Sequence, residues 1–460
     1  MLLIQNAHIK TMAGEDLPNG CLLVEDGKIA AVAALSVCLM GLAFFGGYIT
    51  RTYTNPYRSL EWVIELIGKN YVVYDEETGE LKEFTAEDFT DAIVAQLLDQ
   101  YSAYYTAEEY TDVVDSNLGN KYGVGLYFYA ASEDPVIAQV AGNSPAERAG
   151  IVAGGQVTSL VYDGKTYEIG SYDDFSAALA DVPYAADGSA RFQISVRYPG
   201  EETDIFYELQ REAYVEGEVW YRDSVSSCSF LSEEAGKDPV LTETEQPLEG
   251  LDDKTAYVKL GSFMGQAYAQ FSAVMNHMKE RGRTELILDL RGNGGGSMNI
   301  LAGIASYLIA SGDAERLNVA RAEYKNGSYQ DFLSETVCKD RYVPGKIAVL
   351  ADENTASASE CLIGAMMDYG STTEETLVIT KNGDTARTYG KGIMQTTYVN
   401  PTGGDALKLT TAYIYWPVSH TSIHGTGIRT AEANEIVPGG FGTDRELDRA
   451  VSIMCRQDNG

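Results

Sequence analysis

Histidine is scarce in this chain, which has only four among 460 residues. None of them stands at zinc-ligand spacing from a cysteine, and the six cysteines form no C-x-x-C pair. The cysteines therefore indicate buried or incidental thiols, and a single disulfide stays open without a pair that can be named. We expect no metal site.

Positively charged residues are also scarce. Lys and Arg number 34 against 67 Asp and Glu, which gives a net charge of −33 at pH 7. A surface this acidic repels nucleic acid and anionic lipid, so neither is expected as a partner. The length and the hydrophobic fraction of 45% are enough for two or three packed domains.

Nucleotide-binding loops are also missing. The glycine-rich stretch DLRGNGGG, residues 289–296, is not followed by Gly-Lys-Ser/Thr, and Ser297 takes the place of the last glycine in G-x-G-x-x-G. No nucleotide or other cofactor is therefore expected. Two interpretations remain. The stretch is either a tight strand–helix turn or a cluster of backbone N–H groups around Gly294–Gly296 that holds the oxyanion of a reacting carbonyl.

Charge is absent from one long run. Residues 29–50 are uncharged and lie between Lys28 and Arg51. A membrane-spanning helix needs about 20 predominantly apolar residues, so the run predicts a transmembrane anchor, with a buried core helix as the alternative. We expect a single-pass protein of the cell membrane whose bulk follows the anchor.

Residues 1–28 are interpreted as two short strands around a DLPNG turn. They resemble the opening strands of an amidohydrolase-type enzyme, but the histidine-rich metal site of such an enzyme is absent. We interpret this amidohydrolase-like strand pair as extraneous, without chemistry of its own.

Residues 51–117 predict a small helical unit. Leu60 and Ile64 share one helical face, and Thr85 with Asp88 makes a capping pattern before a second amphipathic segment. Core packing accounts for both segments, so we assign no chemistry to them.

Residues 255–380 repeat one unit three times: a short apolar run, a turn rich in small residues and an amphipathic helix. Such alternation predicts parallel strands joined by right-handed crossovers, with ligands beyond the carboxyl ends of the strands. Two informative turns, residues 291–297 and 352–359, are expected at that edge.

A nucleophile is one interpretation of NTASASE, residues 354–360. A serine at a strand-to-helix turn has its hydroxyl near helix N–H groups, although serine also suits caps and tight packing. The later histidines, His277, His420 and His424, form no evident Ser-His-Asp pattern, and we expect His277 on the surface face of its helix. The alternative base is a lysine, because burial lowers the pKa of an amine and Ser-Lys pairs are a known variant of the triad.

Lys391 is that candidate base. It lies between Gly390 and Gly392, which permit a close approach, and Gln395 stands where it can orient the amine. For this stretch on its own, a charged surface loop is the alternative.

Residues 118–212 alternate strands, turns and a short helix, and GNSPAERAGIVAGGQVTSL resembles the central signature of a PDZ domain. The resemblance implies a module that binds an extended peptide at a sheet edge and captures its carboxylate on loop amides. The peptide-binding candidates are the four central residues of YGVGLYF: Gly123, Val124, Gly125 and Leu126. The chain departs from the family pattern at Gly155, where an acidic residue is usual.

The combination of DLRGNGGG, NTASASE and TYGKGIMQ after a PDZ signature resembles the carboxyl-terminal processing proteases, also called tail-specific serine proteases. The resemblance covers residues 52–447. It implies an α/β fold in which a ClpP/crotonase-like core of βα repeats, residues 213–460, carries an inserted PDZ domain and an N-terminal helical unit.

The same resemblance implies roles for individual residues. Ser357 would be the nucleophile, Lys391 the base and Gln395 its partner. The oxyanion donors would be the backbone N–H groups of Gly295 and Ala358.

The sequence thus predicts a membrane-anchored serine endopeptidase that works outside the cytoplasm on proteins with exposed carboxyl-terminal tails, as a monomer or a homo-oligomer. Lys391 follows Ser357 by 34 residues, more than the family usually shows, and we expect the extra residues of STTEETLVITKNGDTA in a surface hairpin. That spacing and the altered Gly155 motivate an alternative, a catalytically inactive PDZ-bearing adaptor. An acyl-CoA hydratase-like enzyme on a related βα fold is the third hypothesis.

Overall fold

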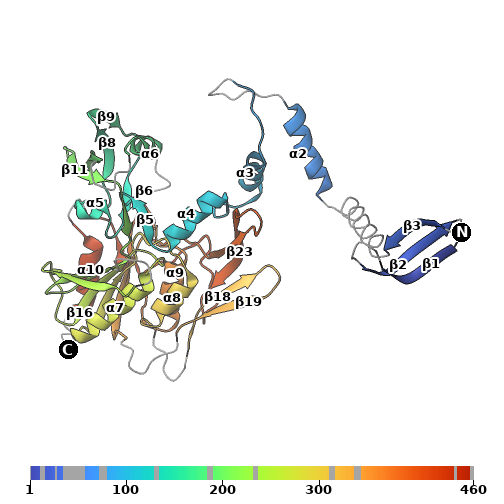
Figure 1. Ribbon diagram of the computed structural model, residues 1–460. Helices are drawn as coiled ribbons and strands as arrows, with labels where there is room; N and C mark the ends of the chain where they lie inside the picture. The colour runs from blue at the N-terminus through green and yellow to red at the C-terminus, as the bar shows by residue number, and fades with distance from the viewer. Residues whose placement is uncertain are drawn as a thin grey trace. The chain divides into compact units, whose positions relative to one another are not determined.

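The computed structural model describes residues 2–10, 16–25, 28–34, 57–71, 80–128, 134–183, 190–231, 237–309, 316–335, 343–439 and 443–455. It divides into two compact units, Met1–Leu97 and Leu98–Gly460, and Figure 1 labels many of their elements.

The first unit begins with a three-stranded antiparallel sheet in the order β1 (Leu2–Lys10), β2 (Asp16–Glu25) and β3 (Lys28–Ala34). The predicted pair of strands around a DLPNG turn is wrong. Leu17 and Gly20 of that stretch pair with Ile9 and Ala7 inside the sheet, so their backbone groups belong to the ladder and the chain does not turn there.

The predicted transmembrane anchor is also wrong. Residues 29–34 lie in β3, where Val32 and Ala33 pair with Leu22 and Cys21 of β2. This pairing satisfies their backbone groups across a sheet, not along a helix. The rest of the predicted anchor, residues 35–50, lies outside the described residues. Among those that are described, no helix is long and apolar enough to cross a bilayer, which overturns the predicted single-pass location in the cell membrane with an extracytoplasmic protease domain.

The first unit also contains the two expected helices, α2 (Arg58–Asn70) and α3 (Ala86–Leu97). At the start of α3, the Thr85 N–H donates to the Asp88 carboxylate at 2.8 Å, and the Asp88 N–H donates to the Thr85 hydroxyl at 3.3 Å. These reciprocal bonds satisfy donors that a helix start leaves free, which is why the capping pattern in the sequence marks this boundary.

The second unit opens with β4 (Ala103–Tyr105) and α4 (Ala107–Asn117), and then forms a module with a hydrophobic core of its own. In this module β6 (Leu126–Phe128) pairs with β7 (Ile137–Val140), and β5 (Asn120–Gly123) pairs with β12 (Glu212–Val215). Its main sheet has the order β11-β10-β8-β9, and its remaining elements are α5 (Pro145–Arg148), β8 (Gln156–Tyr162), β9 (Lys165–Glu168), α6 (Tyr172–Ala180), β10 (Arg191–Arg197) and β11 (Ile205–Gln210).

The rest of the second unit is organised by an eight-stranded sheet in the order β15-β14-β13-β16-β17-β20-β21-β24. From β16 to β24 the strands are parallel, as the βα repeats predict, and the remaining strands pair antiparallel. The strands are β13 (Val219–Arg222), β14 (Ser227–Leu231), β15 (Val240–Thr244), β16 (Thr255–Leu260), β17 (Glu285–Asp289), β20 (Lys346–Ala351), β21 (Leu377–Thr380) and β24 (Glu435–Ile436).

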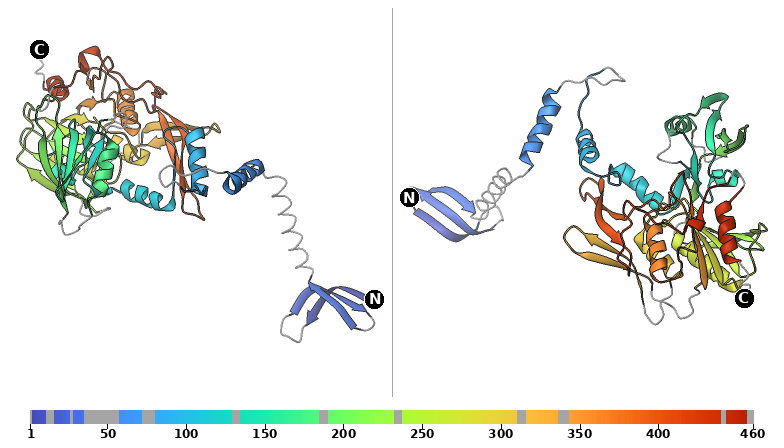
Figure 2. Two further views of the ribbon diagram at one scale, coloured as in Figure 1. Left: turned by 90° about the horizontal axis from the view of Figure 1, so that it is seen from above. Right: turned by 180° about the vertical axis from the view of Figure 1, so that it is seen from behind.

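Helices cover both faces of this sheet. Leu286 and Leu288 of β17 belong to the core shared with α7 (Ala267–Glu280), α8 (Met298–Ala305) and α9 (Ala358–Asp368). Ile287, between them in β17, belongs to the core shared with α10 (Arg445–Met454). Because successive side chains of a strand point to opposite faces, the result is a three-layered α/β structure that can be followed in Figure 2.

A second sheet has the order β19-β18-β23-β22, with β4 added to β23. Its strands are β18 (Asn318–Tyr324), β19 (Tyr329–Leu333), β22 (Ile393–Val399) and β23 (Ala406–Tyr415), and a short 3-10 helix, η1 (Glu432–Asn434), precedes β24. The expected surface hairpin in residues 371–386 is wrong. This stretch contains β21, a strand of the central sheet in which Leu377, Val378 and Ile379 are buried between β20 and β24.

Candidate active site

Ser357 lies at the turn between β20 and α9 and is half-buried. Its φ of 57° with ψ of −116° is an unusual conformation for a residue with a side chain, and costs on the order of 1–3 kcal/mol. Neighbouring bonds hold it in place, since the Ala356 N–H and the Ser359 hydroxyl both donate to the Asn293 carbonyl, at 3.0 and 2.9 Å. A strained serine at a strand-to-helix turn is the geometry of a nucleophile elbow.

The glycine turn lies directly against this serine, at the carboxyl edge where the strand pattern predicts both turns. A Cβ on Gly295 would approach the Ser357 Cβ and the Ala356 carbonyl oxygen to 2.8 Å, and φ of Gly295 is +101°. Only glycine fits this position without displacing the serine.

The two predicted oxyanion donors differ in their present partners. The Ala358 N–H is the first of α9 and makes no hydrogen bond within the described part of the chain. The Gly295 N–H donates to the buried Asn293 Oδ1 at 2.9 Å, so this donor would have to exchange that partner for a substrate oxygen.

Lys391 lies in the loop before β22 and is partly buried. Burial lowers the pKa of its amine, and the positive charge of Lys408 lowers it further, while the carboxylates of Asp99 and Glu360 act in the opposite direction. The Lys391 Nζ makes no hydrogen bond with the Ser357 hydroxyl in the structure, and lies 5.0 Å from the centre of the Tyr101 ring.

Glu360 connects the serine turn to the lysine loop, a role that the sequence reasoning missed. Its buried carboxylate accepts the N–H of Ser357 at 3.0 Å, the N–H of Lys391 at 2.9 Å and the N–H of Gly390 at 2.8 Å, together with the Thr388 hydroxyl at 2.5 Å. Burial raises the pKa of this carboxyl despite these bonds. The detectable signal was Ser-x-x-Glu at the start of a helix, the pattern of a capping box.

Gln395 does not meet Lys391 as predicted, because its Nε2 donates to the Thr410 hydroxyl at 3.0 Å across β22 and β23. The glycines beside Lys391 do permit a close approach, but to a different segment. A Cβ on Gly390 would lie 2.8 Å from the Gly427 nitrogen, and one on Gly392 would lie 2.8 Å from the His424 nitrogen.

His277 and His420 have aromatic partners of their own. His277 is buried, with its ring 4.9 Å from that of Tyr221 and its Nε2 3.5 Å from the Cys228 sulfur, so the expectation of a surface position is wrong. Its helix packs that face onto β13 and β14, which periodicity alone did not reveal. His420 stacks on Tyr415 at 4.2 Å. The described residues contain no cluster of three or more His, Cys, Asp or Glu able to hold a metal ion.

The predicted peptide-binding loop lines a cavity of about 290 Å³ in the PDZ-like module. Leu126 of β6 forms one wall, and Phe175 and Leu179 of α6 form another. Among the residues that the structure describes, strand β6 pairs with β7 and with no other strand, and its residues Leu126, Tyr127 and Phe128 all line the cavity. The four predicted residues all contribute to the lining: Gly123, Val124, Gly125 and Leu126.

The structure also explains the departure at Gly155. A Cβ there would come within 2.4 Å of the Val196 Cγ1 and 2.8 Å of the Tyr198 ring, so the backbone at this point has no room for an acidic side chain.

A second cavity, of about 210 Å³, lies between the module and the glycine turn. Gly294 and Gly295 line it from the core, and Glu218 lines it as a buried carboxyl whose pKa is raised to about 8, by burial first and by the nearby Glu216 second. Lys121 and Tyr127 line this cavity and also the one in the PDZ-like module, so the two are neighbours.

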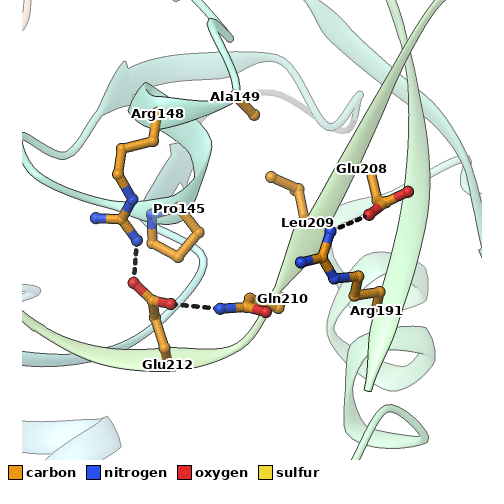
Figure 3. A pocket seen from close by; sticks show the side chains of 8 residues that line it. All are labelled: Pro145, Arg148, Ala149, Arg191, Glu208, Leu209, Gln210 and Glu212. Carbon is orange, nitrogen blue, oxygen red and sulfur yellow. Dashed lines mark hydrogen bonds and ion pairs between the residues drawn. The ribbon is translucent and has the colours of Figure 1, made fainter. Parts of the chain in front are cut away.

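A third hollow belongs to the PDZ-like module alone (Figure 3). The ion pairs Arg148–Glu212 and Arg191–Glu208 line it and neutralise one another. It contains no nucleophile next to a base, so the chemistry belongs to the site around Ser357.

The site has a hydroxyl on a strained strand-to-helix turn and backbone N–H groups beside it. A carboxylate connects this turn to the loop that carries a partly buried amine. This is the arrangement of an α/β serine hydrolase. Residues 254–431, which contain these groups, match the family described as Peptidase family S41. The chain therefore carries a peptidase S41 domain and is homologous to carboxyl-terminal processing proteases, which are serine peptidases.

Several relatives illustrate the extent of the similarity. A CtpA-like serine protease of Staphylococcus epidermidis is 25% identical over 374 residues, 81% of this chain and 64% of that protein. The chloroplastic C-terminal processing peptidase of Tetradesmus obliquus is 26% identical over 333 residues, 71% of this chain and 63% of that protein. The chain thus spans just under two thirds of the length of these relatives. Among solved structures, a photosystem II D1 C-terminal processing protease aligns with a TM-score of 0.46 at 22% identity, over 76% of this chain and 82% of that one.

Proposed function

We propose that this chain is a serine endopeptidase that captures exposed carboxyl-terminal tails of proteins and cleaves them with Ser357 as nucleophile and Lys391 as base. The observation that carries the proposal is the Glu360 carboxylate, which accepts the backbone N–H groups of both residues and so ties their loops together. The lowered pKa of Lys391 supports the assignment, because only the neutral amine can accept a proton.

In the proposed reaction the Ser357 oxygen attacks the carbonyl carbon of the scissile peptide bond while its proton moves to the neutral Lys391 amine. The negative oxygen that forms is held by the Ala358 N–H, and by the Gly295 N–H once it leaves Asn293. The C–N bond then breaks, and the Lys391 ammonium returns the proton to the departing amine. Water hydrolyses the resulting ester and restores the serine.

The lysine side chain has to move for this reaction, since its amine now lies over Tyr101 and Gln395 bonds Thr410. Catalytic hydrogen bonds are often open in a resting enzyme and close when substrate binds. We propose that Gln395 then orients the amine toward Ser357.

The substrate assignment rests on the PDZ-like module. An extended tail would add to the edge of β6 away from β7, with its carboxylate at the amides of the Gly123–Leu126 loop and an apolar side chain against Phe175 and Leu179. The neighbouring cavity at the glycine turn offers a route from this groove toward Ser357.

The non-catalytic adaptor is the competing function, but the long spacing that motivated this hypothesis has a structural explanation. The 34-residue spacing between Ser357 and Lys391 is taken up by the buried strand β21, and the two loops still meet at Glu360. The match to a peptidase family argues against the acyl-CoA hydratase-like hypothesis.

Substitution of the nucleophile tests the proposal. We expect Ser357→Ala to abolish cleavage of an unstructured protein such as casein while the thermal unfolding temperature stays within a few degrees of that of the unmodified chain. Retained cleavage would exclude Ser357 as nucleophile. Binding of a tail peptide by an unmodified chain that cleaves no substrate would favour the adaptor.

A further inference from the structure

The Lys391 ammonium has an aromatic neighbour that the proposed reaction does not use. Its Nζ lies 5.0 Å from the centre of the Tyr101 ring, within the range of a cation–π contact. Within the part of the chain that the structure describes, no hydrogen bond or ion pair to this Nζ accompanies the contact.

Hydrogen bonds fix the loop that carries this ring. The Tyr101 N–H and the Ser102 hydroxyl donate to the Asp99 carboxylate at 3.1 and 2.8 Å, and the Ser102 hydroxyl in turn accepts the Thr410 N–H of β23 at 3.1 Å. At its other end the Tyr101 hydroxyl meets the Tyr389 hydroxyl at 3.3 Å. Tyr389 is anchored to the serine turn, since its N–H donates to the Thr355 carbonyl at 3.0 Å.

Charged and titratable groups from several elements lie around the Lys391 amine. Asp99 lies on the same loop as Tyr101, Glu360 is on α9, Lys408 is on β23, and Tyr389 stands beyond the Tyr101 hydroxyl. The two carboxylates favour the ammonium form of Lys391 and Lys408 disfavours it. The ring adds a further preference for the ammonium, because its quadrupole attracts a cation more than a neutral amine.

We propose that Tyr101 is a positioning residue whose ring holds the Lys391 ammonium in the resting enzyme. This inference rests on the proposed function of Lys391 as base. It assigns a role to LLDQYSAYY, a stretch that sequence reasoning places in the helical unit without chemistry.

The sign of the effect follows from the charge. Without the ring the ammonium loses a stabilising contact, so Lys391 gives up its proton at lower pH. The acidic limb of the profile of kcat/KM against pH should then shift downward by about 0.4 to 1.5 pH units, the equivalent of a typical cation–π contact.

The test compares Tyr101→Leu, which removes the ring but keeps an apolar side chain, with Tyr101→Phe, which keeps the ring and loses only the contact with Tyr389. The full chain is labelled with ¹³C-lysine, the Lys391 resonance is assigned by its loss in Lys391→Met, and its pKa is titrated directly. The acidic limb is measured on casein. Tyr167→Leu is the matched control, because it removes a ring 4.0 Å from Lys165 in the PDZ-like module.

We expect the Lys391 pKa and the acidic limb to fall together in Tyr101→Leu and to stay unchanged in Tyr101→Phe and Tyr167→Leu. Tyr101→Met serves as the second ring-free variant if Tyr101→Leu does not fold. Equal pKa values in the ring-free and ring-retaining variants, or a uniform loss of activity without a shift, would overturn the inference. If Ser357→Ala still cleaves, the proposed function fails, whereas the resonance titration still decides the contact with Tyr101.

Discussion

Hydrogen bonds from two distant segments converge on the Glu360 carboxylate, and this residue accounts for the geometry of the candidate site. Ser357 is three residues before it, whereas Lys391 belongs to a loop that follows another strand of the sheet. A buried carboxylate is expensive to desolvate, and several N–H and O–H donors offset that cost. The backbones of Ser357 and Lys391 are thereby placed by one carboxylate, while the lysine amine lies over the Tyr101 ring.

At this scale the charge of Lys408 predicts a pH effect. Its ammonium lowers the pKa of Lys391, so Lys408→Met should raise that pKa. Neutral Lys391 would then be available only at higher pH, and the acidic limb of kcat/KM should shift upward, opposite in direction to the shift expected for Tyr101→Leu.

The measurement is a pH profile of casein cleavage for the unmodified chain and Lys408→Met, with the exposed Lys325→Met as the control. A limb that stays in place or moves to lower pH in Lys408→Met alone would show that Lys408 does not influence the base.

Elements position the site through close approaches of their backbones. The glycine turn after β17 meets the turn after β20 so tightly that a side chain at Gly295 would collide with Ser357, while nothing lies within 4 Å of a Cβ on Gly294. We therefore expect Gly295→Ala to lower kcat/KM by about 100-fold or more, because it displaces both the nucleophile and an oxyanion donor.

Gly294→Ala is the matched control for this prediction, and it should retain most of the activity. Both variants are measured on the same substrate, with thermal unfolding as a check on folding. Similar losses in the two variants would mean that the turn as a whole, not the contact of Gly295 with Ser357, is sensitive.

The groove between β6 and α6 makes a second prediction at the scale of elements. Ser176 is exposed on α6 and lines the cavity, whereas its neighbour Ala177 is exposed but does not. An indole at residue 176 should fill the groove, so Ser176→Trp should weaken binding of a tail peptide by about 10-fold or more, while Ala177→Trp should leave it unchanged.

Fluorescence anisotropy of a labelled peptide with a free carboxylate measures this affinity, and the amidated peptide shows whether the carboxylate is recognised. Equal binding by the two variants would place the tail elsewhere on the molecule.

At the scale of the whole molecule, one arginine joins the central sheet to the carboxyl-terminal helix. Arg291 binds Asp289 at the end of β17 and Asp444 at the start of α10, with contacts of 2.6 to 3.1 Å. The pKa of the fully buried Asp289 is lowered, because Arg291 and its hydrogen bonds outweigh the effect of burial. We expect Arg291→Met to destabilise the second unit by about 3–5 kcal/mol, since it leaves a buried carboxylate without its partner.

The pH dependence supplies the check. Because Asp289 has a lower pKa in the folded chain than in the unfolded one, its stabilising effect is present above about pH 4 and is lost as the pH falls. Urea unfolding at about pH 5 and about pH 2 should show a smaller pH dependence in Arg291→Met than in the unmodified chain. If the free energy of unfolding changes equally between the two pH values in both proteins, the acid sensitivity belongs to other carboxylates.

Local sequence patterns predicted much of the architecture. The period of the apolar residues predicted α2 and α3 and the parallel strands β16, β17 and β20, because these elements are defined by which face is buried. The strand-to-helix turns at Gly295 and Ser357 followed from the same alternation, since consecutive βα units bring their turns to one edge of a sheet.

The predictions for two long runs were wrong, because composition does not distinguish a strand from a helix. The apolar residues after Lys28 predicted a helix, yet those up to Ala34 pair with β2. Residues 371–386 looked like an insertion, yet they supply β21, whose place depends on β20 and β24 on either side. Pairing partners far along the chain decide such cases, and no local period reveals them.

The amino-acid sequence by itself determined the βα order of the core, the residue types at the two turns and the resemblance that named Ser357 and Lys391. Only the tertiary structure decided that Glu360 unites their loops, that Gln395 bonds Thr410, and that the lysine amine lies over Tyr101. The physical reason is distance along the chain. Helix and strand periods arise among near neighbours, whereas hydrogen bonds and ring contacts between remote segments exist only once the sheet has brought those segments together.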